Sequence, residues 1–420
     1  MSQRPDRLLI RGGRPLRGAV AVSGSKNAAL YALAAGLLTA EPVSVRNVPE
    51  IADVDEMGEL LAALGARVRC TDGVVCIEAA EIATTSAPVD LVLALRASFL
   101  VMGPLLARAG EAACASPGGD VIGARPIDVH LAGFRALGAT VSRRGADWVA
   151  SAPRLRGARV FLDYPSVLGT VNVMFAAALA EGTTTIINAA AEPEVAMVAE
   201  MLGAMGARIN GHGGNTLTVE GVPRLHGCDF TVIPDRLEAG TLLLAGAATG
   251  GDVRVTNAVP GHLDSLCAKL GEMGVTIERS EEGGVRAASR GRLEPMQAQA
   301  VPYPGFPTDL HAPLAAALTQ AGGVSIIHER VYDNRTLYVG ELRKLGARIT
   351  VGGQSVIVEG ATPLVGAAVR ALDIRAGAAC VIAGLAAEGE TQVHGTSHLD
   401  RGYAHLEAQL RALGADVERG

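Results

Sequence analysis

The sequence predicts an α/β protein of two similar domains, each built from three βαβαββ-type units with the helices buried and the sheets outside. Three observations support this fold class: a short motif that recurs six times, an apolar segment ahead of each copy, and alternating segments between them. The chain has 420 residues, of which 49% are hydrophobic and 19% charged. It is therefore long enough to form two hydrophobic cores.

The recurrent motif is Leu or Met, then Gly, then Ala or Val, as in LGARV at Leu64 and MGVTI at Met273. Self-similarity at a fixed interval indicates one supersecondary unit used six times. The glycines of the motif recur about every 70 residues, at positions 65, 138, 206, 274, 346 and 414.

The apolar segments ahead of the motif are expected to be helices. They are apolar almost all round, which is typical of helices packed inside a domain, and several end in Gly, which tolerates the left-handed conformation of a helix end. These segments are residues 23–38, 95–110, 166–182, 235–251, 308–323 and 373–389. Short alternating segments predict strands and hairpins at 43–48, 66–79, 183–189, 252–258, 323–329, 347–360 and 391–396.

Composition excludes several classes of protein. A net charge of −6 and 3% aromatic residues argue against a nucleic-acid partner. The six cysteines form no CxxC pair and are expected to be buried, reduced thiols of a cytoplasmic protein. The N-terminal residues lack a signal peptide, and the longest apolar run, 97–107, is too short to cross a bilayer, so no membrane partner is expected. We find no metal cluster, Rossmann fingerprint or P-loop and expect no cofactor.

Polar residues cluster at the starts of the six predicted helices. If internal symmetry turns these starts toward one cleft, free backbone N–H groups and basic side chains would form a site for a polyanion. The alternative is that Ser166, Asp235 and Asp309 are N-caps and that the basic residues are solvated. The residues at the helix starts are Lys26, Asn27, Arg96, Ser166, Asp235, Arg236, Asp309 and Arg375.

Six motifs together resemble the UDP-N-acetylglucosamine 1-carboxyvinyltransferases, in the enolpyruvyl transferase family that also contains EPSP synthase: SGSKNAAL, RASFLVMGPLLAR, PGGDVIGARPIDVH, FPTDL, DIRAG and HLDRGY. The resemblance is collinear over nearly the whole chain. It implies two inside-out α/β barrels, of residues 26–233 and of residues 1–25 with 234–420, and an active site in the cleft between them. It also implies a monomer that transfers the enolpyruvyl group of phosphoenolpyruvate to the 3-hydroxyl of UDP-N-acetylglucosamine, the first committed step of peptidoglycan synthesis.

Site residues follow from the same resemblance. Lys26, Arg125 and Arg401 are expected to hold phosphoenolpyruvate, with Arg96 and Arg375 close by, and Asn27 is expected to contact the acceptor. Several fixed donors suit a small trianion, and the planar fork of arginine matches carboxylate and phosphate. The expected nucleotide contacts are Arg125, Pro126, Ile127, Asp128, Val129, Tyr164, Pro165, Ser166, Val167 and Val331.

Two carboxylates are expected to move protons. Asp309 matches the general base of the family, and it must be partly desolvated to be a useful base. Asp120 stands where most relatives carry a cysteine, on a loop thought to supply the general acid, and Pro117-Gly118-Gly119 would give the loop its turn and mobility. The alternative for Asp120 is a turn cap. Cys114 is expected to lie in the core. Because a carboxylate is a weaker nucleophile than the thiol that it replaces at position 120, thiol-directed epoxides such as fosfomycin should not inactivate the protein.

Departures from the family pattern fall where the nucleotide would bind. Leu168 replaces a glycine of SVGAT, Ala191 replaces an arginine, and residues 332–338 read YDNRTLY in place of FENRFMH. Three hypotheses are therefore open: the UDP-N-acetylglucosamine enzyme, a paralogue acting on another uridine nucleotide such as UMP, and a non-catalytic nucleotide-sugar binding protein.

Overall fold

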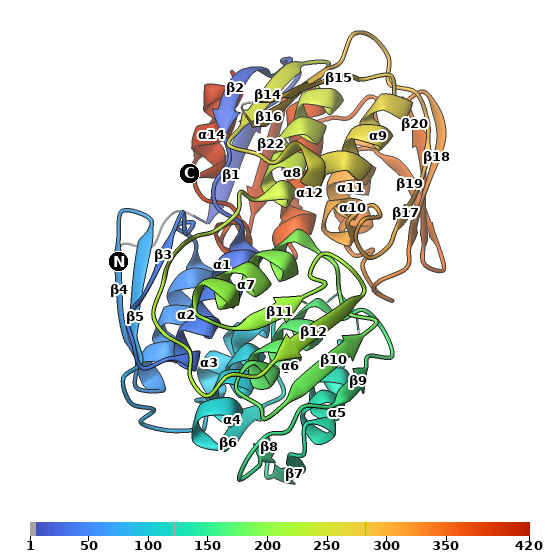
Figure 1. The fold of residues 1–420 in the computed structure, drawn as a ribbon. Coiled ribbons are helices and arrows are strands. Elements are labelled where there is room, and N and C mark those ends of the chain that lie inside the picture. Colours follow the sequence, from blue (N-terminus) through green and yellow to red (C-terminus); the bar gives the residue numbers. More distant parts are fainter. Residues whose placement is uncertain (1–5, 121, 124, 282) are drawn as a thin grey trace. The chain divides into compact units, whose positions relative to one another are not determined.

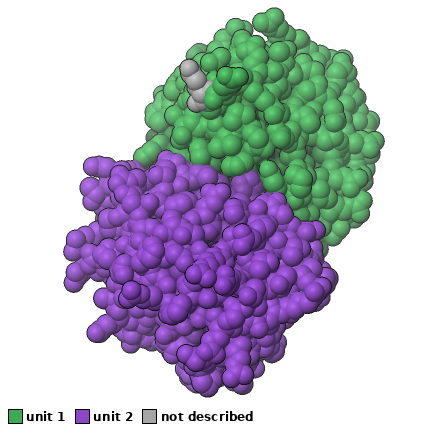
Figure 2. Space-filling view, viewed as in Figure 1, with its two compact units in different colours: residues 1–23, 120–124, 234–420 green, residues 24–119, 125–233 purple. Residues whose placement is uncertain are grey.

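Helices form the interior of two units in the computed structural model, which describes residues 6–120, 122–123, 125–281 and 283–420. Unit 1 comprises residues 1–23, 120–124 and 234–420, and unit 2 comprises residues 24–119 and 125–233 (Figure 2). The chain therefore leaves unit 1 after its first two strands, contributes residues 120–124 to it, and returns to it for the rest of its length at residue 234.

Apolar helices pack against one another inside each unit (Figure 1). Those of unit 1 are α8 (Arg236–Ala248), α10 (His311–Leu318) and α12 (Ile374–Ala386). Those of unit 2 are α1 (Lys26–Ala35), α4 (Met102–Ala109) and α6 (Val167–Ala178). Nearly every side chain of these helices is buried, because small residues let the helices approach closely on all sides.

Three sheets surround the helices of each unit. Five of the six sheets have one parallel strand pair followed by two antiparallel pairs. In unit 1 their order is β2 (Arg17–Ala21), β14 (Asp252–Thr256), β16 (Gly284–Ala288), β15 (Thr276–Ser280); β17 (Gln297–Ala300), β18 (Gly323–Glu329), β20 (Ser355–Gly360), β19 (Arg348–Gly352); and β21 (Ala368–Arg370), β22 (Glu390–His394), β1 (Arg7–Arg11), β23 (Asp416–Arg419).

The sheets of unit 2 follow the same plan, which confirms the predicted α/β fold with helices inside and sheets outside. Their order is β13 (Asp229–Thr231), β3 (Val43–Arg46), β5 (Val74–Glu78), β4 (Arg67–Thr71); β9 (Arg159–Phe161), β10 (Thr183–Ile187), β12 (Thr216–Glu220), β11 (Arg208–Asn210); and β6 (Glu111–Ala115), β8 (Asp147–Ser151), β7 (Thr140–Arg144). The third sheet is extended by an isolated parallel bridge between Ser86 and Ala113.

A second helix in each repeat ends at the recurrent glycine. All six glycines have positive φ, between 82° at Gly274 and 108° at Gly65, which is the left-handed conformation that closes a helix. The motif found in the sequence is therefore a helix stop followed by a strand. The helices are α2 (Ala52–Ala63), α5 (Asp128–Ala136), α7 (Pro193–Ala204), α9 (Asp264–Glu272), α11 (Tyr338–Lys344) and α14 (Leu406–Ala412).

Three asparagines form a repeated device that the sequence analysis missed. Asn47, Asn188 and Asn257 each follow the second strand of a parallel pair and have φ of 51° to 59°. The side-chain amide of each donates to a backbone carbonyl just beyond the first strand of the pair, at 2.8 to 2.9 Å. Asparagine fits here because it tolerates the left-handed region and can satisfy a strand-end carbonyl.

Two predicted helices are interrupted. Residues 95–110 form the 3₁₀ segment η2 (Arg96–Val101) before α4, and residues 308–318 form η4 (Thr308–Leu310) before α10. Pro104 and Pro313 lie at the third position of α4 and α10. Proline lacks the backbone N–H and is tolerated only in the first turn of an α-helix, so the α-helix cannot extend far ahead of either proline. The remaining short elements are α3 (Val89–Ala94), α13 (Ser397–Asp400), η1 (Gly36–Leu38) and η3 (Pro260–Leu263).

The prediction that all six cysteines are buried is wrong for part of the set. Cys114, Cys267 and Cys380 are buried, whereas Cys70 is exposed because it lies on the edge strand β4. Over the residues that the structure describes, none of the helices has both the length and the apolar character needed to span a bilayer.

Candidate active site

The carboxylate of Asp309 lies between two buried guanidinium groups in unit 1. Arg335 Nη2 is 2.8 Å from Asp309 Oδ1, and Arg375 Nη2 and Nε are 3.0 and 3.1 Å from Oδ2. Both arginine side chains are 6% exposed, against 26% for Asp309. Burial raises the pKa of Asp309, but the charges and hydrogen bonds of Arg335 and Arg375 outweigh burial and hold the pKa well below its ordinary value. The group is therefore ionised, in the form that can accept a proton.

Asp309 is not a helix cap, which corrects the alternative weighed above. No side-chain hydrogen bond caps η4 or α10, because the carboxylate is engaged by arginines from distant parts of the chain. The neighbouring Thr308 hydroxyl instead accepts from Arg335 Nη1 at 2.8 Å and donates to Glu329 Oε2 at 2.7 Å. The other carboxylate oxygen of Glu329 accepts from the N–H of Val331 at 2.7 Å, which holds this expected nucleotide contact beside Asp309.

Arg375 also stacks on an aromatic ring. Its guanidinium carbon lies 5.3 Å from the ring centroid of Tyr403, and the Tyr403 hydroxyl is 2.9 Å from Thr241 Oγ1 on α8. Cation–π contact orients the guanidinium without removing its charge. Asp373 caps α12 by accepting from the N–H groups of Arg375 and Ala376, both at 2.8 Å.

Asp120 meets Arg401 in the same unit. Arg401 Nη1 is 2.7 Å from Asp120 Oδ1, and the side chains are 18% and 19% exposed. Three residues further on, Gly123 has φ of 112°, and a Cβ there would lie 1.8 Å from Asp333 Oδ1. Asp120 is thus bound by Arg401, and Gly123 lies against Asp333, in the stretch that supplies Arg335.

Lys26 is buried in unit 2, at the start of α1. Its Nζ is 2.7 Å from Asp53 Oδ2, with side chains 10% and 1% exposed. Ser25 caps the helix by accepting from the N–H of Ala28 at 3.4 Å. The partially buried Asn27 follows in the first turn. A buried cation is costly unless it is paired, and Asp53 supplies the counter-charge that holds the ammonium group of Lys26 in place.

Arg96 binds the backbone on both sides of the Asp120 segment. Its Nη1 donates to the Pro117 carbonyl at 3.3 Å, and its Nη2 donates to the carbonyls of Arg125 and Pro126. Gly118 and Gly119 are required here by close approach, and Gly119 also has a positive φ of 107°. A Cβ at Gly118 would lie 1.8 Å from the Leu93 carbonyl oxygen, and one at Gly119 would lie 2.9 Å from Arg125 Nη2.

The remaining expected nucleotide contacts lie on two helix starts of unit 2. Asp128 opens α5, and its Oδ1 accepts from the Val129 N–H at 2.9 Å and from the Tyr164 hydroxyl at 3.1 Å. Ser166 caps α6 by accepting from the Gly169 N–H at 3.1 Å, which is the alternative weighed for it in the sequence. The hydrogen bond between Asp128 and Tyr164 links the two groups of residues, 125–129 and 164–167.

Sequence reasoning missed Asp53, Arg335 and Tyr403. Arg335 stands in the stretch YDNRTLY, which was singled out for its departures and not for the arginine that it retains. No local signal marks Asp53 as the partner of Lys26, because the two residues are on different helices. The structure brings Asp309, Arg335, Arg375 and Tyr403 together in unit 1, and Arg96, Pro126, Asp128 and Tyr164 together in unit 2.

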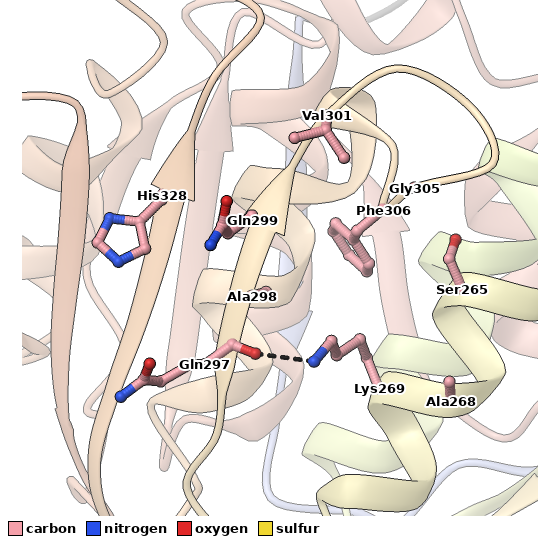
Figure 3. A pocket seen from close by; sticks show the side chains of 10 residues that line it. All are labelled: Ser265, Ala268, Lys269, Gln297, Ala298, Gln299, Val301, Gly305, Phe306 and His328. Atoms are coloured by element: carbon pink, nitrogen blue, oxygen red, sulfur yellow. Dashed lines mark hydrogen bonds between the residues drawn. The ribbon is translucent and has the colours of Figure 1, made fainter.

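A hollow of about 400 Å³ lies elsewhere in unit 1, between α9 and the strands β17 and β18 (Figure 3). Two of its polar side chains, Lys269 and His328, are engaged in hydrogen bonds. Lys269 Nζ donates to the Gln297 carbonyl and to Glu272, and His328 Nδ1 is 2.6 Å from Ser355 Oγ. None of the expected site residues lines it.

Comparison with known proteins shows the family to which the chain belongs. The family model described as EPSP synthase (3-phosphoshikimate 1-carboxyvinyltransferase) matches residues 10–410. UDP-N-acetylglucosamine 1-carboxyvinyltransferase 2 of Carboxydothermus hydrogenoformans is 49% identical, and the enzyme of Nitratidesulfovibrio vulgaris is 46% identical, each over 99% of both chains. The crystal structure of the enolpyruvyl transferase NikO from Streptomyces tendae shares 29% identity and a TM-score of 0.87 over 99% of both chains. EPSP synthase from Acinetobacter baumannii, at 20% identity and a TM-score of 0.73 over 98% of this chain and 99% of the other, shares the fold.

Proposed function

Because this chain belongs to the carboxyvinyltransferase family that includes EPSP synthase and the UDP-N-acetylglucosamine 1-carboxyvinyltransferases, we propose that it transfers the enolpyruvyl group of phosphoenolpyruvate to the 3-hydroxyl of UDP-N-acetylglucosamine. The observation that carries the proposal is the 49% identity over 99% of both chains with an enzyme of that name. The alternative hypothesis, a paralogue that acts on UMP, has no such support. The reaction would supply the first committed intermediate of peptidoglycan.

The chemistry needs two proton transfers. Protonation of phosphoenolpyruvate at C3 and addition of the sugar hydroxyl oxygen to C2 give a tetrahedral ketal. Loss of a proton from the C3 methyl group and of phosphate from C2 then restores the double bond. We assign the C3 protonation to Asp120 and the removal of the hydroxyl proton to Asp309. Asp309 then releases that proton to solvent, so that it can accept the methyl proton in the second stage. After turnover Asp309 loses this second proton to solvent and Asp120 regains one from it.

The contacts in unit 1 support these two roles. Asp309 is held ionised by Arg335 and Arg375, so it is ready to accept a proton, and an arginine that turns to substrate would increase its basicity. The guanidinium group of Arg401, which binds Asp120 in the structure, would also bind the phosphate of phosphoenolpyruvate. A second anion on that guanidinium would favour the neutral carboxyl that a general acid needs.

Lys26, Arg96 and Arg125 are the cations that we propose from unit 2. The ion pair of Lys26 with Asp53 orients the ammonium group. Arg96 donates to the carbonyls of Pro117, Arg125 and Pro126, which fixes the two ends of the segment that carries Asp120. Arg96 is thus proposed as a positioning residue for that segment as well as a neighbour of the substrate.

The test is phosphate release from phosphoenolpyruvate with each acceptor in turn. UDP-N-acetylglucosamine alone should support turnover, and UMP and 3-phosphoshikimate should not. Turnover with UMP and not with the UDP-sugar would support the paralogue hypothesis. No phosphate release with any acceptor, from protein shown to bind UDP-N-acetylglucosamine by calorimetry, would support the non-catalytic hypothesis.

A further inference from the structure

A buried side-chain amide in unit 2 contacts three segments at once. Asn172 on α6 is 0% exposed. Its Oδ1 accepts from the Gly103 N–H at 2.7 Å, and its Nδ2 donates to the Phe99 carbonyl at 2.9 Å. Because a backbone N–H only donates and a carbonyl only accepts, these two contacts determine which end of the amide is oxygen.

The third contact determines the form of a histidine. Asn172 Nδ2 lies 3.0 Å from His130 Nδ1, and its second hydrogen is free for this bond because Phe99 takes the first. His130 Nδ1 must therefore accept, which leaves the ring proton on Nε2 and the ring neutral. The environment agrees: burial, followed by the charge of Arg96, lowers the pKa of His130 to about 3.

Packing leaves this network no freedom to shift. The His130 ring lies edge-on to Phe99, with centroids 5.1 Å apart. A Cβ at Gly103 would lie 2.5 Å from both the backbone oxygen and Oδ1 of Asn172. The Gly103 N–H thus bonds to a side chain at the junction of η2 and α4, where the 3₁₀ turn gives way to the α-helix.

Two of the segments that Asn172 contacts, and the helix α6 that carries it, begin at expected site residues. Segment η2 starts at Arg96, α5 starts at Asp128, and α6 starts after its cap Ser166. His130 lies two residues after Asp128, in the first turn of α5. The amide of Asn172 therefore ties together the three helix starts on which residues 96, 125–129 and 164–167 depend.

We propose that Asn172 and His130, the latter as its neutral Nε2–H tautomer, are positioning residues that align the starts of η2, α5 and α6 for binding of the nucleotide. The role in binding rests on the proposed function, whereas the tautomer and the network do not.

The tautomer is tested on the protein without substrate, by ¹⁵N NMR of the imidazole ring. We expect the Nδ1 shift of an unprotonated nitrogen and the Nε2 shift of a protonated one. In Asn172→Asp the new carboxylate has no hydrogen to donate, so Nδ1 should become the protonated nitrogen. A protonated Nδ1 in the wild-type protein, or an unchanged ring in the variant, would overturn the assignment.

The positioning role is tested by kinetics. His130→Leu leaves the second amide hydrogen of Asn172 without an acceptor, and KM for UDP-N-acetylglucosamine should rise about tenfold, which is the order of a lost buried hydrogen bond. kcat at saturating nucleotide should change little. His130→Asn returns an acceptor oxygen near the place of Nδ1 and should recover most of the loss.

The matched control is His226→Gln, which alters an exposed histidine of the same unit whose Nδ1 contacts only a neighbouring carbonyl, and its KM should match the wild type. If His130→Leu and His130→Asn have equal KM values, or if kcat falls in place of KM, the positioning role is wrong. If the wild-type protein releases no phosphate with the UDP-sugar, the proposed function fails, and the role in binding fails with it. The NMR result would still decide the tautomer.

Discussion

Arg401 Nη1 and Asp120 Oδ1 are 2.7 Å apart although 281 residues separate them in the chain. The pair joins the residue that would protonate phosphoenolpyruvate to a residue that would bind its phosphate. Arrival of the substrate anion at Arg401 would therefore alter the surroundings of the proposed acid directly. This coupling between binding and proton transfer is what the proposed mechanism needs from a carboxylate at position 120.

Fosfomycin should not inactivate this protein, because the position that would be alkylated is a carboxylate. The nearby thiol of Cys114 is buried on β6, and burial, with a smaller contribution from Asp147, raises its pKa to about 12. Asp120→Cys should be labelled by fosfomycin in the presence of UDP-N-acetylglucosamine, as measured by intact-protein mass spectrometry. Labelling of the wild-type protein in the peptide that contains residue 120 would contradict the prediction.

Asp309→Asn should lower kcat at least about a hundredfold, the usual size of a lost general base. It should also cost about 3 kcal/mol of stability at pH 7, because Arg335 and Arg375 lose their buried counter-charge. The matched control is Asp264→Asn, since Asp264 pairs with Arg279 at 2.7 Å but is 62% exposed. Equal losses of stability in the two variants would contradict the burial argument.

The stability of the wild-type protein should also depend on pH through Asp309. Its folded pKa is lowered, so its contribution is present above the unfolded pKa of about 3.9 and is lost as the pH falls below that value. Urea unfolding at pH 7 and pH 3 should therefore show the gap between wild type and Asp309→Asn closing at the lower pH. A constant gap would show that another group is responsible.

Glu238 gives the opposite pH dependence. It is 2% exposed, and it accepts from the Ser23 N–H at 3.0 Å and from Gln409 Nε2 at 2.5 Å. Its pKa is raised to about 7, mainly by burial and then by Asp235. A raised folded pKa contributes stability that is complete below the ordinary value and is lost as the pH rises to about 7. The free energy of unfolding of Glu238→Gln should therefore rise relative to that of the wild type, by up to about 1.4 kcal/mol for each pH unit in that window. Equal differences in unfolding free energy at pH 5 and pH 8 would refute this assignment.

Gly123→Ala should lower kcat, because a methyl group would meet the carboxylate of Asp333 and prevent docking of the Asp120 segment. Gly138→Ala is the matched control: Gly138 has φ of 93°, close to the 112° of Gly123, but nothing lies within 4 Å of its Cβ position. Both variants carry backbone strain, so only the contact differs. Similar kcat values for the two variants would mean that the contact with Asp333 does not matter.

Local features of the fold were predictable because each depends on a few neighbouring residues. The six helix stops follow from glycine at each recurrent motif, and the caps at Ser166 and Asp235 follow from their side chains alone. The alternative reading of Asp309 as a cap was wrong because two arginines compete for the same carboxylate. The breaks ahead of α4 and α10 were missed, although Pro104 and Pro313 mark both places.

By itself the sequence determined the repeat, the buried helices, the enclosing sheets and the residue types suited to an anionic substrate, since periodicity and composition are properties of the chain. Only the tertiary structure decided which charges meet: Asp53 with Lys26, Arg335 and Arg375 with Asp309, and Arg401 with Asp120. The physical reason is that the energy of an ion pair depends on the distance between its groups and on their burial, and the packing of distant segments sets both.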